Sequence, residues 1–171
     1  MPDVQPNSTI PVHVAPFAHR LPNFASRLGG NGAIKVVAIG SSSTAGEGGI
    51  VPYTYRVETA LRAKYAGRMI DVLNRGIKGQ EAPEELDRMQ TDVIDEKPAL
   101  VIWQVGTNAV WQPGRDLDKA AAAIAAGLKL LGKQAMDVVL MDLQYVPALL
   151  TEDKIGATRR MMSLVANAAA E

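Results

Sequence analysis

Three short segments of this sequence combine hydroxyl, glycine and carboxamide groups that together could carry out acyl-transfer chemistry. Residues 40–46 read GSSSTAG, residues 74–79 read NRGIKG and residues 106–108 read GTN. A serine hydroxyl can attack an acyl carbon, while a glycine N–H and an asparagine carboxamide can donate hydrogen bonds to the oxygen that becomes charged. If the fold brings the three segments together, they supply a nucleophile and an oxyanion hole.

Each of these segments directly follows a run of residues with the features of a β-strand. The predicted strands cover residues 34–39, 69–73, 99–105 and 138–143. The third strand is almost uninterrupted in apolar character, as expected when both faces of a sheet are covered. Helical patterns alternate with the strands, which indicates βαβ units and a parallel sheet. Because reactive groups gather at the carboxyl ends of parallel strands, we expect the three segments on one rim.

The helical patterns complete a predicted three-layer α/β/α sandwich. One helix is expected after Pro52, and a second after Asp116 and Asp118, either of which could cap it. A third is expected after Thr151, with inward-facing side chains at Ile155, Met162 and Val165. Right-handed crossovers between parallel strands then predict the strand order 2-1-3-4. Residues 1–33 are rich in Pro and Asn without periodicity, so they are predicted to be an extended arm, and residues 34–171 a single domain.

Composition excludes several classes of function. The chain has 171 residues, 47% hydrophobic and 21% charged, and its 18 basic residues balance 18 acidic ones. Zero formal charge and the absence of a Lys/Arg block predict no nucleic-acid partner and no anionic membrane surface. No apolar run reaches the roughly 18 residues of a membrane span. The chain contains no cysteine, which excludes disulfides and thiolate catalysis. No signal peptide is predicted, and localisation stays open between the cytoplasm and, if a leader was removed, an exported state.

The segment after the first strand resembles a known family, the SGNH hydrolases, also called GDSL lipases and esterases. Residues 40–44 are similar to that family's first block, Gly-Asp-Ser-Leu-Thr, with Ser42 at the nucleophile position. Ser41 stands where the family usually has Asp. The resemblance covers residues 34 to about 143, and it implies a flavodoxin-like α/β/α fold.

The two later segments resemble the family's second and third blocks. The resemblance implies that the backbone amide of Gly79 and the side-chain amide of Asn108 form the oxyanion hole. Ala109 replaces the Asp that commonly follows. Each block alone is common loop chemistry, and the alternative is that Gly79 and Asn108 are only turn residues. Three blocks in order, each after a predicted strand, favour the catalytic interpretation of Ser42, Gly79 and Asn108.

The family's fourth block, Asp-x-x-His, is missing, and no histidine follows His19. Because an unassisted serine hydroxyl is a poor nucleophile, the chain as given is predicted to be inactive. His13 and His19 lie in the predicted arm and are interpreted as surface residues. We expect the natural polypeptide to continue for roughly 30 to 60 residues, enough for a fifth strand and a histidine loop. Without that strand, the edge of the fourth strand is expected to be covered by another chain or by remaining residues.

The sequence therefore predicts a serine esterase for a small acyl ester, and the resemblance offers carbohydrate O-acetyl esters as one substrate class. Candidate substrate contacts are Trp111, Gln144 and Tyr145, which follow the third and fourth strands. No cofactor or metal is predicted. Two alternatives stay open: a flavodoxin-like domain that binds FMN through residues 40–46, and a non-catalytic SGNH-like binding module.

Overall fold

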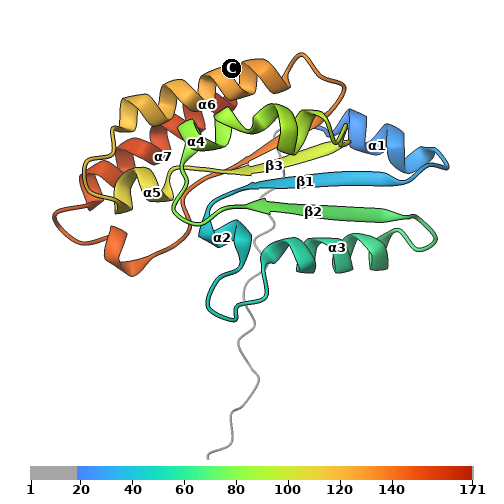
Figure 1. Ribbon diagram of the computed structural model, residues 1–171, viewed down its shortest axis with the longest axis horizontal. Coiled ribbons are helices and arrows are strands. Elements are labelled where there is room, and N and C mark those ends of the chain that lie inside the picture. Colours follow the sequence, from blue (N-terminus) through green and yellow to red (C-terminus); the bar gives the residue numbers. More distant parts are fainter. Residues whose placement is uncertain (1–18, 171) are drawn as a thin grey trace, which may run out of the picture.

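The computed structural model describes residues 19–170, which fold around a four-stranded parallel sheet (Figure 1). The strand order is β2-β1-β3-β4, as predicted from the alternation of strands and helices. The observed strands are close to the predicted ones, and β2 extends three residues further than expected. Their bounds are β1 Ile34–Gly40, β2 Ile70–Gly76, β3 Leu100–Gln104 and β4 Asp137–Met141.

Helices cover both faces of this sheet and form the predicted three layers. The helices α1 (Pro22–Gly29) and α3 (Tyr53–Lys64) pack against one face. The other face is covered by α4 (Ala82–Asp87), the π-helical turn η1 (Gln90–Ile94), α6 (Leu117–Leu131) and α7 (Ile155–Ala170). Three short elements lie in the connections: α2 (Ser42–Ala45), α5 (Thr107–Trp111) and the 3₁₀ turn η2 (Pro147–Leu149).

Successive side chains of β1 and β3 point to opposite faces of the sheet, and both sets belong to the core. Val37 and Trp103 are fully buried toward α4 and α6, whereas Val36 and Ala38 are fully buried toward α3. Burial on both faces explains why these strands are almost continuously apolar. Asp116 caps α6 by accepting hydrogen bonds from the N–H groups of Asp118 and Lys119, which selects between the two predicted caps.

The prediction of an extended arm is wrong for residues 22–29, which form α1. Leu21 at its N-cap offers no side-chain acceptor, so the cap comes from elsewhere. The Asp137 carboxylate at the start of β4 accepts from Phe24 N at 2.8 Å and from Asn23 Nδ2 at 2.9 Å. Phe24 is buried against the sheet. Residues 1–18 of the predicted arm, including His13, lie outside the described residues.

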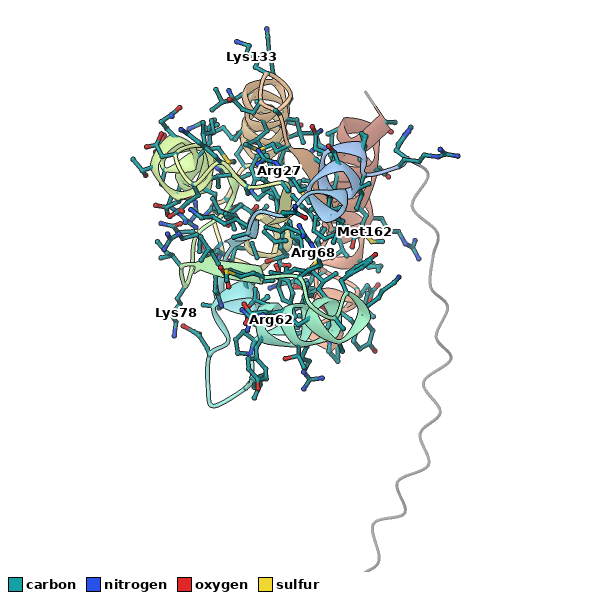
Figure 2. The ribbon with its side chains drawn as sticks, turned by 90° about the vertical axis from the view of Figure 1, so that its right-hand side faces the viewer. Arg27, Arg62, Arg68, Lys78, Lys133 and Met162 are labelled. Carbon is teal, nitrogen blue, oxygen red and sulfur yellow. The ribbon has the colours of Figure 1, made fainter. Side chains whose placement is uncertain are left out.

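The inward face of α7 also differs from the expectation at one position. Thr158, Met161 and Val165 are buried, whereas Met162, labelled in Figure 2, is 45% exposed. Residues 158, 161 and 165 are separated by three and four positions and share one helix face. Met162 is about 100° away from Met161 around the helix, so it cannot join that face.

Among the described residues, β4 pairs only with β3, so its outer edge has no strand partner there. An apolar groove of about 600 Å³ runs along this edge between α7 and the residues that precede α1, and its lining includes His19, Val139 and Ala166. The predicted fifth strand is not among residues 19–170, and it stays a prediction. No helix within residues 19–170 combines the length and apolar character required to span a membrane.

Candidate active site

The three candidate segments leave the same end of the sheet. Gly40 at the end of β1 is paired in register with Gly76 at the end of β2, and Ile77 N donates to Gly40 O at 2.9 Å. Figure 1 shows α2 and α5, which follow β1 and β3, at this end of the sheet. The parallel topology therefore places residues 41–46, 77–81 and 106–111 on one rim, as the sequence predicts.

Ser42 is the first residue of α2, in a tight helical turn. The carbonyl of Ser41 accepts from Thr44 N at 3.1 Å and from Ala45 N at 2.9 Å, which fixes the turn. The Ser42 side chain is half-buried and lines a cavity of about 270 Å³ together with five other residues: Ser43, Gly46, Glu47, Ile50 and Gln144. Within residues 19–170 no hydrogen-bond partner engages the Ser42 hydroxyl, so it is free to meet a substrate.

The position of α2 depends on a close approach at Gly76. A Cβ atom at Gly76 would overlap the backbone nitrogen of Ala45, so only glycine lets α2 lie against the end of β2. Asn74 Nδ2 donates to Thr44 O at 2.7 Å and secures the same turn. The second segment therefore positions the turn that carries Ser42.

Gly79 lies in a turn in which its backbone N–H has no described hydrogen-bond partner. Its φ of +76° lies in the left-handed region that favours glycine. Its N–H makes no hydrogen bond to any described residue, while its carbonyl accepts from Gln112 Nε2 at 3.0 Å and from the Arg115 guanidinium at 3.3 Å. The loop is thus anchored through the carbonyl, and the N–H is left available.

Asn108 lies in the first turn of α5 and is 7% exposed. Its Nδ2 donates to the carbonyl of Gln80 at 2.8 Å, directly beside Gly79. A carboxamide nitrogen carries two hydrogens, so one remains for a substrate oxygen. This bond joins the third segment to the second.

A chain of polar side chains joins the third segment to the nucleophile turn. The Ser41 hydroxyl donates to Gln104 Oε1 at 3.4 Å, and Gln104 Nε2 donates to the Thr107 hydroxyl at 3.1 Å. Thr107 also accepts from the backbone N–H of Gln144 at 3.1 Å, and the Gln144 side chain accepts from Ser43. The residues on both sides of Ser42 are therefore linked to the residue before Asn108.

The sequence interpretation missed Glu81, which links the segment after β2 to the segment after β3. Its side chain is 3% exposed, and its carboxylate accepts from Gly106 N and Ala109 N, both at 2.8 Å, and from Ala82 N at 3.0 Å. Glu84 completes a capping box by accepting from Glu81 N at 3.1 Å. Two acidic residues three positions apart around Pro83 are a signal for this helix start, but they do not reveal the contacts to residues 106–109.

Of the three candidate substrate contacts, one lines the cavity that contains Ser42 and two do not. Gln144 lines the cavity that contains Ser42. Trp111 is 46% exposed at the end of α5, with Lys154 Nζ 4.6 Å from the centre of its ring. Tyr145 is 79% exposed, and neither aromatic residue lines the Ser42 cavity. Their roles in binding stay predictions.

Glu85 is a buried acid close to the site. It is 1% exposed in α4; Trp103 Nε1 donates to its Oε2 at 2.7 Å, and its Oε1 has no partner among residues 19–170. Burial raises the pKa of Glu85 to about 8; the hydrogen bond from Trp103 lowers that pKa, and the Glu81 carboxylate raises it. Glu85 is therefore largely protonated at neutral pH.

No described histidine lies beside Ser42. His19 lines the apolar groove along β4, near Asp137 at the amino end of the sheet. Within residues 19–170 no group of three His, Asp or Glu side chains is arranged to bind a metal ion.

The turn at residues 41–46 is poorly arranged for a flavin phosphate. The hydroxyls of Ser41 and Thr44 point inward, to Gln104 and to the Tyr53 hydroxyl. The N–H groups of residues 44–46 are used inside the turn. A phosphate cradle needs several free hydroxyls and amides, so this arrangement disfavours the FMN alternative.

Solved structures share this fold. The chain is similar to an acetylxylan esterase from Geobacillus stearothermophilus, with a TM-score of 0.72 and 23% identity over 82% of this chain and 74% of the esterase. A variant of that esterase is 25% identical over the same shares, with a TM-score of 0.71. A protein assigned to the lipolytic G-D-S-L family, from Desulfitobacterium hafniense, is 28% identical over 78% of this chain and 71% of its own, with a TM-score of 0.60.

Sequence comparison extends beyond the described residues. The uncharacterized lipoprotein YqeF of Bacillus subtilis is 37% identical over 82 residues, which is 46% of this chain and 33% of YqeF. The aligned part therefore spans about a third of that relative. The model of the non-GDSL lipase-like family matches residues 7–170. With the strand order and the three rim segments, this match confirms the resemblance drawn from the sequence: the chain belongs to the non-GDSL lipase-like family and has the α/β fold of SGNH hydrolases.

Proposed function

We propose that this protein is a serine esterase in which Ser42 is the nucleophile and Gly79 and Asn108 form the oxyanion hole. One observation carries the proposal: a free hydroxyl and two available N–H donors lie on the rim formed by β1, β2 and β3, and hydrogen bonds link Asn108 and the residues next to Ser42, Gly79 and Asn108. An acyl-transfer site needs such fixed donors, because they stabilise the charge that develops on the substrate oxygen.

The proposed reaction has two steps. The Ser42 oxygen attacks the acyl carbon while a base takes its proton, and the ester oxygen departs with that proton as an alcohol. Water then attacks the acyl-serine, which releases the acid and restores the hydroxyl. In both steps the tetrahedral oxyanion accepts from Gly79 N and Asn108 Nδ2.

A small acyl group suits the cavity beside Ser42. At about 270 Å³ it lies just below the range of roughly 300 to 1,000 Å³ typical of larger ligands. The likeness to an acetylxylan esterase supports a carbohydrate O-acetyl ester as the substrate class. We propose Gln144 as an acyl-side contact, because it lines that cavity, and the exposed rings of Trp111 and Tyr145 as contacts for the alcohol part.

The base is the component that the described residues do not provide next to Ser42. Loss of the triad histidine in a serine hydrolase lowers turnover by on the order of a millionfold. We therefore expect the 171-residue chain to show almost no hydrolysis of p-nitrophenyl acetate. Strong hydrolysis that disappears when His13 or His19 is replaced by Ala would instead identify that histidine as the base.

Imidazole-assisted labelling tests the nucleophile without requiring the missing base. The chain is incubated with a fluorophosphonate at increasing imidazole concentration, and the labelled peptide is identified by mass spectrometry. We expect a phosphonyl group on Ser42, at a rate that rises with the neutral imidazole concentration, and no labelling at this position in Ser42→Ala. Labelling confined to other serines, or none at any imidazole concentration, would overturn the assignment of Ser42.

The absence of a described base favours one second candidate, a non-catalytic module that binds acylated carbohydrate. This candidate predicts saturable binding of acetylated xylo-oligosaccharides, unchanged by Ser42→Ala, with no labelling of Ser42. Calorimetry with acetylated and deacetylated oligosaccharides distinguishes the two functions.

A further inference from the structure

Glu81 is a buried carboxylate whose contacts extend beyond its own helix. It lies at the N-cap of α4, two residues after Gly79, and is 3% exposed. Burying a carboxylate is costly unless hydrogen bonds compensate its charge. Helix capping accounts for the bond that its Oε1 accepts from Ala82 N at 3.0 Å. The remaining bonds require another explanation.

Those remaining bonds go to the segment that contains Asn108. Oε1 of Glu81 accepts from Gly106 N and Oε2 accepts from Ala109 N, each at 2.8 Å. Gly106 is the N-cap of α5 and has no side chain to cap it, so the Glu81 carboxylate caps α5 as well as α4. Charged acceptors make shorter and stronger hydrogen bonds than neutral ones, which makes this bridge a stiff connection.

The bridge fixes the distance between the two proposed oxyanion donors. Gly79 is two positions before Glu81, and Asn108 lies between the two N–H groups that the carboxylate binds. We infer that Glu81 is a positioning residue for the oxyanion hole: its carboxylate sets the spacing of Gly79 N and Asn108 Nδ2. This inference rests on the proposed esterase function, but the geometric part can be tested separately.

Shortening the side chain separates capping from positioning. Asp is a preferred N-cap residue, so Glu81→Asp retains the charge and the cap of α4. Its carboxylate is one methylene shorter and cannot reach Gly106 N and Ala109 N at 2.8 Å. Asp116→Ala is the matched control for stability, because it removes a helix cap of α6 that does not contact residues 79–81 or 106–109.

Two readouts are measured on the full chain. The first is the rate of imidazole-assisted phosphonylation of Ser42, well below the melting temperature. A displacement of about 1 Å in a catalytic group can lower a rate by about a hundredfold, so we expect a loss of about that size in Glu81→Asp and no loss in Asp116→Ala. The second is amide NMR, in which Gly79 N–H, Gly106 N–H and the Asn108 side-chain amide should shift in Glu81→Asp only.

The outcomes distinguish the two proposals. If wild type labels at Ser42 and Glu81→Asp labels equally fast, Glu81 does not position the oxyanion hole and the inference is overturned. If wild type never labels but the three amide signals still shift, the esterase proposal fails while the geometric link stands. Unshifted amides in a folded Glu81→Asp protein would also overturn the inference, whatever the labelling rate.

Discussion

The two halves of the candidate site are held by hydrogen bonds of different kinds. The oxyanion half, residues 79–81 with 106–109, is joined by the Glu81 carboxylate and the Asn108 amide through bonds of 2.8 Å. The other half, residues 41–46 with the proposed nucleophile, is held by backbone bonds within one turn and by neutral side-chain bonds to Asn74, Gln104 and Gln144, and the Ser42 hydroxyl has no described partner. Both proposed oxyanion donors are therefore among the described residues, whereas no described histidine lies beside Ser42.

This difference shows that the two parts of a hydrolase site can be assessed separately. Oxyanion donors act through fixed positions and do not themselves transfer a proton. A nucleophile needs a base that can arrive from a distant part of a polypeptide. In imidazole-assisted labelling of Ser42, the added imidazole takes the place of the base, so the labelling rate depends on the oxyanion donors and on the position of Ser42. Variants of either half can therefore be ranked by their labelling rates.

The largest effect is expected from removing an oxyanion donor. Asn108→Ala should lower the imidazole-assisted labelling of Ser42 by about a hundred- to a thousandfold, because one of two donors to the charged oxygen is lost. The melting temperature, measured by circular dichroism, should fall only modestly, because the bond from Asn108 Nδ2 to Gln80 O is lost as well. Asn167→Ala, an exposed substitution in α7, is the control. Retained labelling together with a large drop in melting temperature would make Asn108 a structural turn residue.

A smaller loss of labelling is expected from displacing the nucleophile turn. Gly76→Ala places a Cβ atom against the backbone of Ala45 and should move α2 away from β2. We expect a loss of labelling of up to about a hundredfold and a loss of stability of about 1 to 3 kcal/mol, measured by urea unfolding. Gly156→Ala adds a methyl group in open space and should alter neither. Equal behaviour of the two variants would show that α2 is not positioned by this contact.

Replacing the buried acid Glu85 by Gln is expected to leave the labelling of Ser42 unchanged. It should clearly change how the stability of the fold depends on pH. Its folded-state pKa of about 8 lies above its ordinary value of 4.5, so its neutral form stabilises the fold. That stability is fully present below pH 4.5 and is lost as the pH rises through 8, at up to about 1.4 kcal/mol per pH unit. Urea unfolding from pH 5 to 9 should show this decline in wild type and a flatter profile in Glu85→Gln. A decline of the same slope in both proteins would contradict the assignment.

The sequence predicted the features that depend on local patterns. The strands and their order follow from apolar runs and crossovers, and both were confirmed, whereas the structure had to select Asp116 over Asp118 as the cap of α6. Glu81 was missed because the N–H groups that it binds lie 25 and 28 positions away. Met162 was misplaced because apolar residues adjacent on a helix compete for one inward face. The catalytic roles of Ser42, Gly79 and Asn108 stay predictions, since the spatial link between their loops does not measure reactivity.

The cap of α1 has a consequence for the order in which the fold is completed. An isolated helix of eight residues is marginal in water, and α1 depends on the Asp137 carboxylate for its first N–H groups. Asp137 is synthesised 113 residues after Phe24, which at about 5 to 20 residues per second takes roughly 6 to 23 s. The earliest helix of the described chain is thus expected to dock only after β4 has been synthesised. Until β4 joins the sheet, the buried ring of Phe24 remains accessible to chaperones.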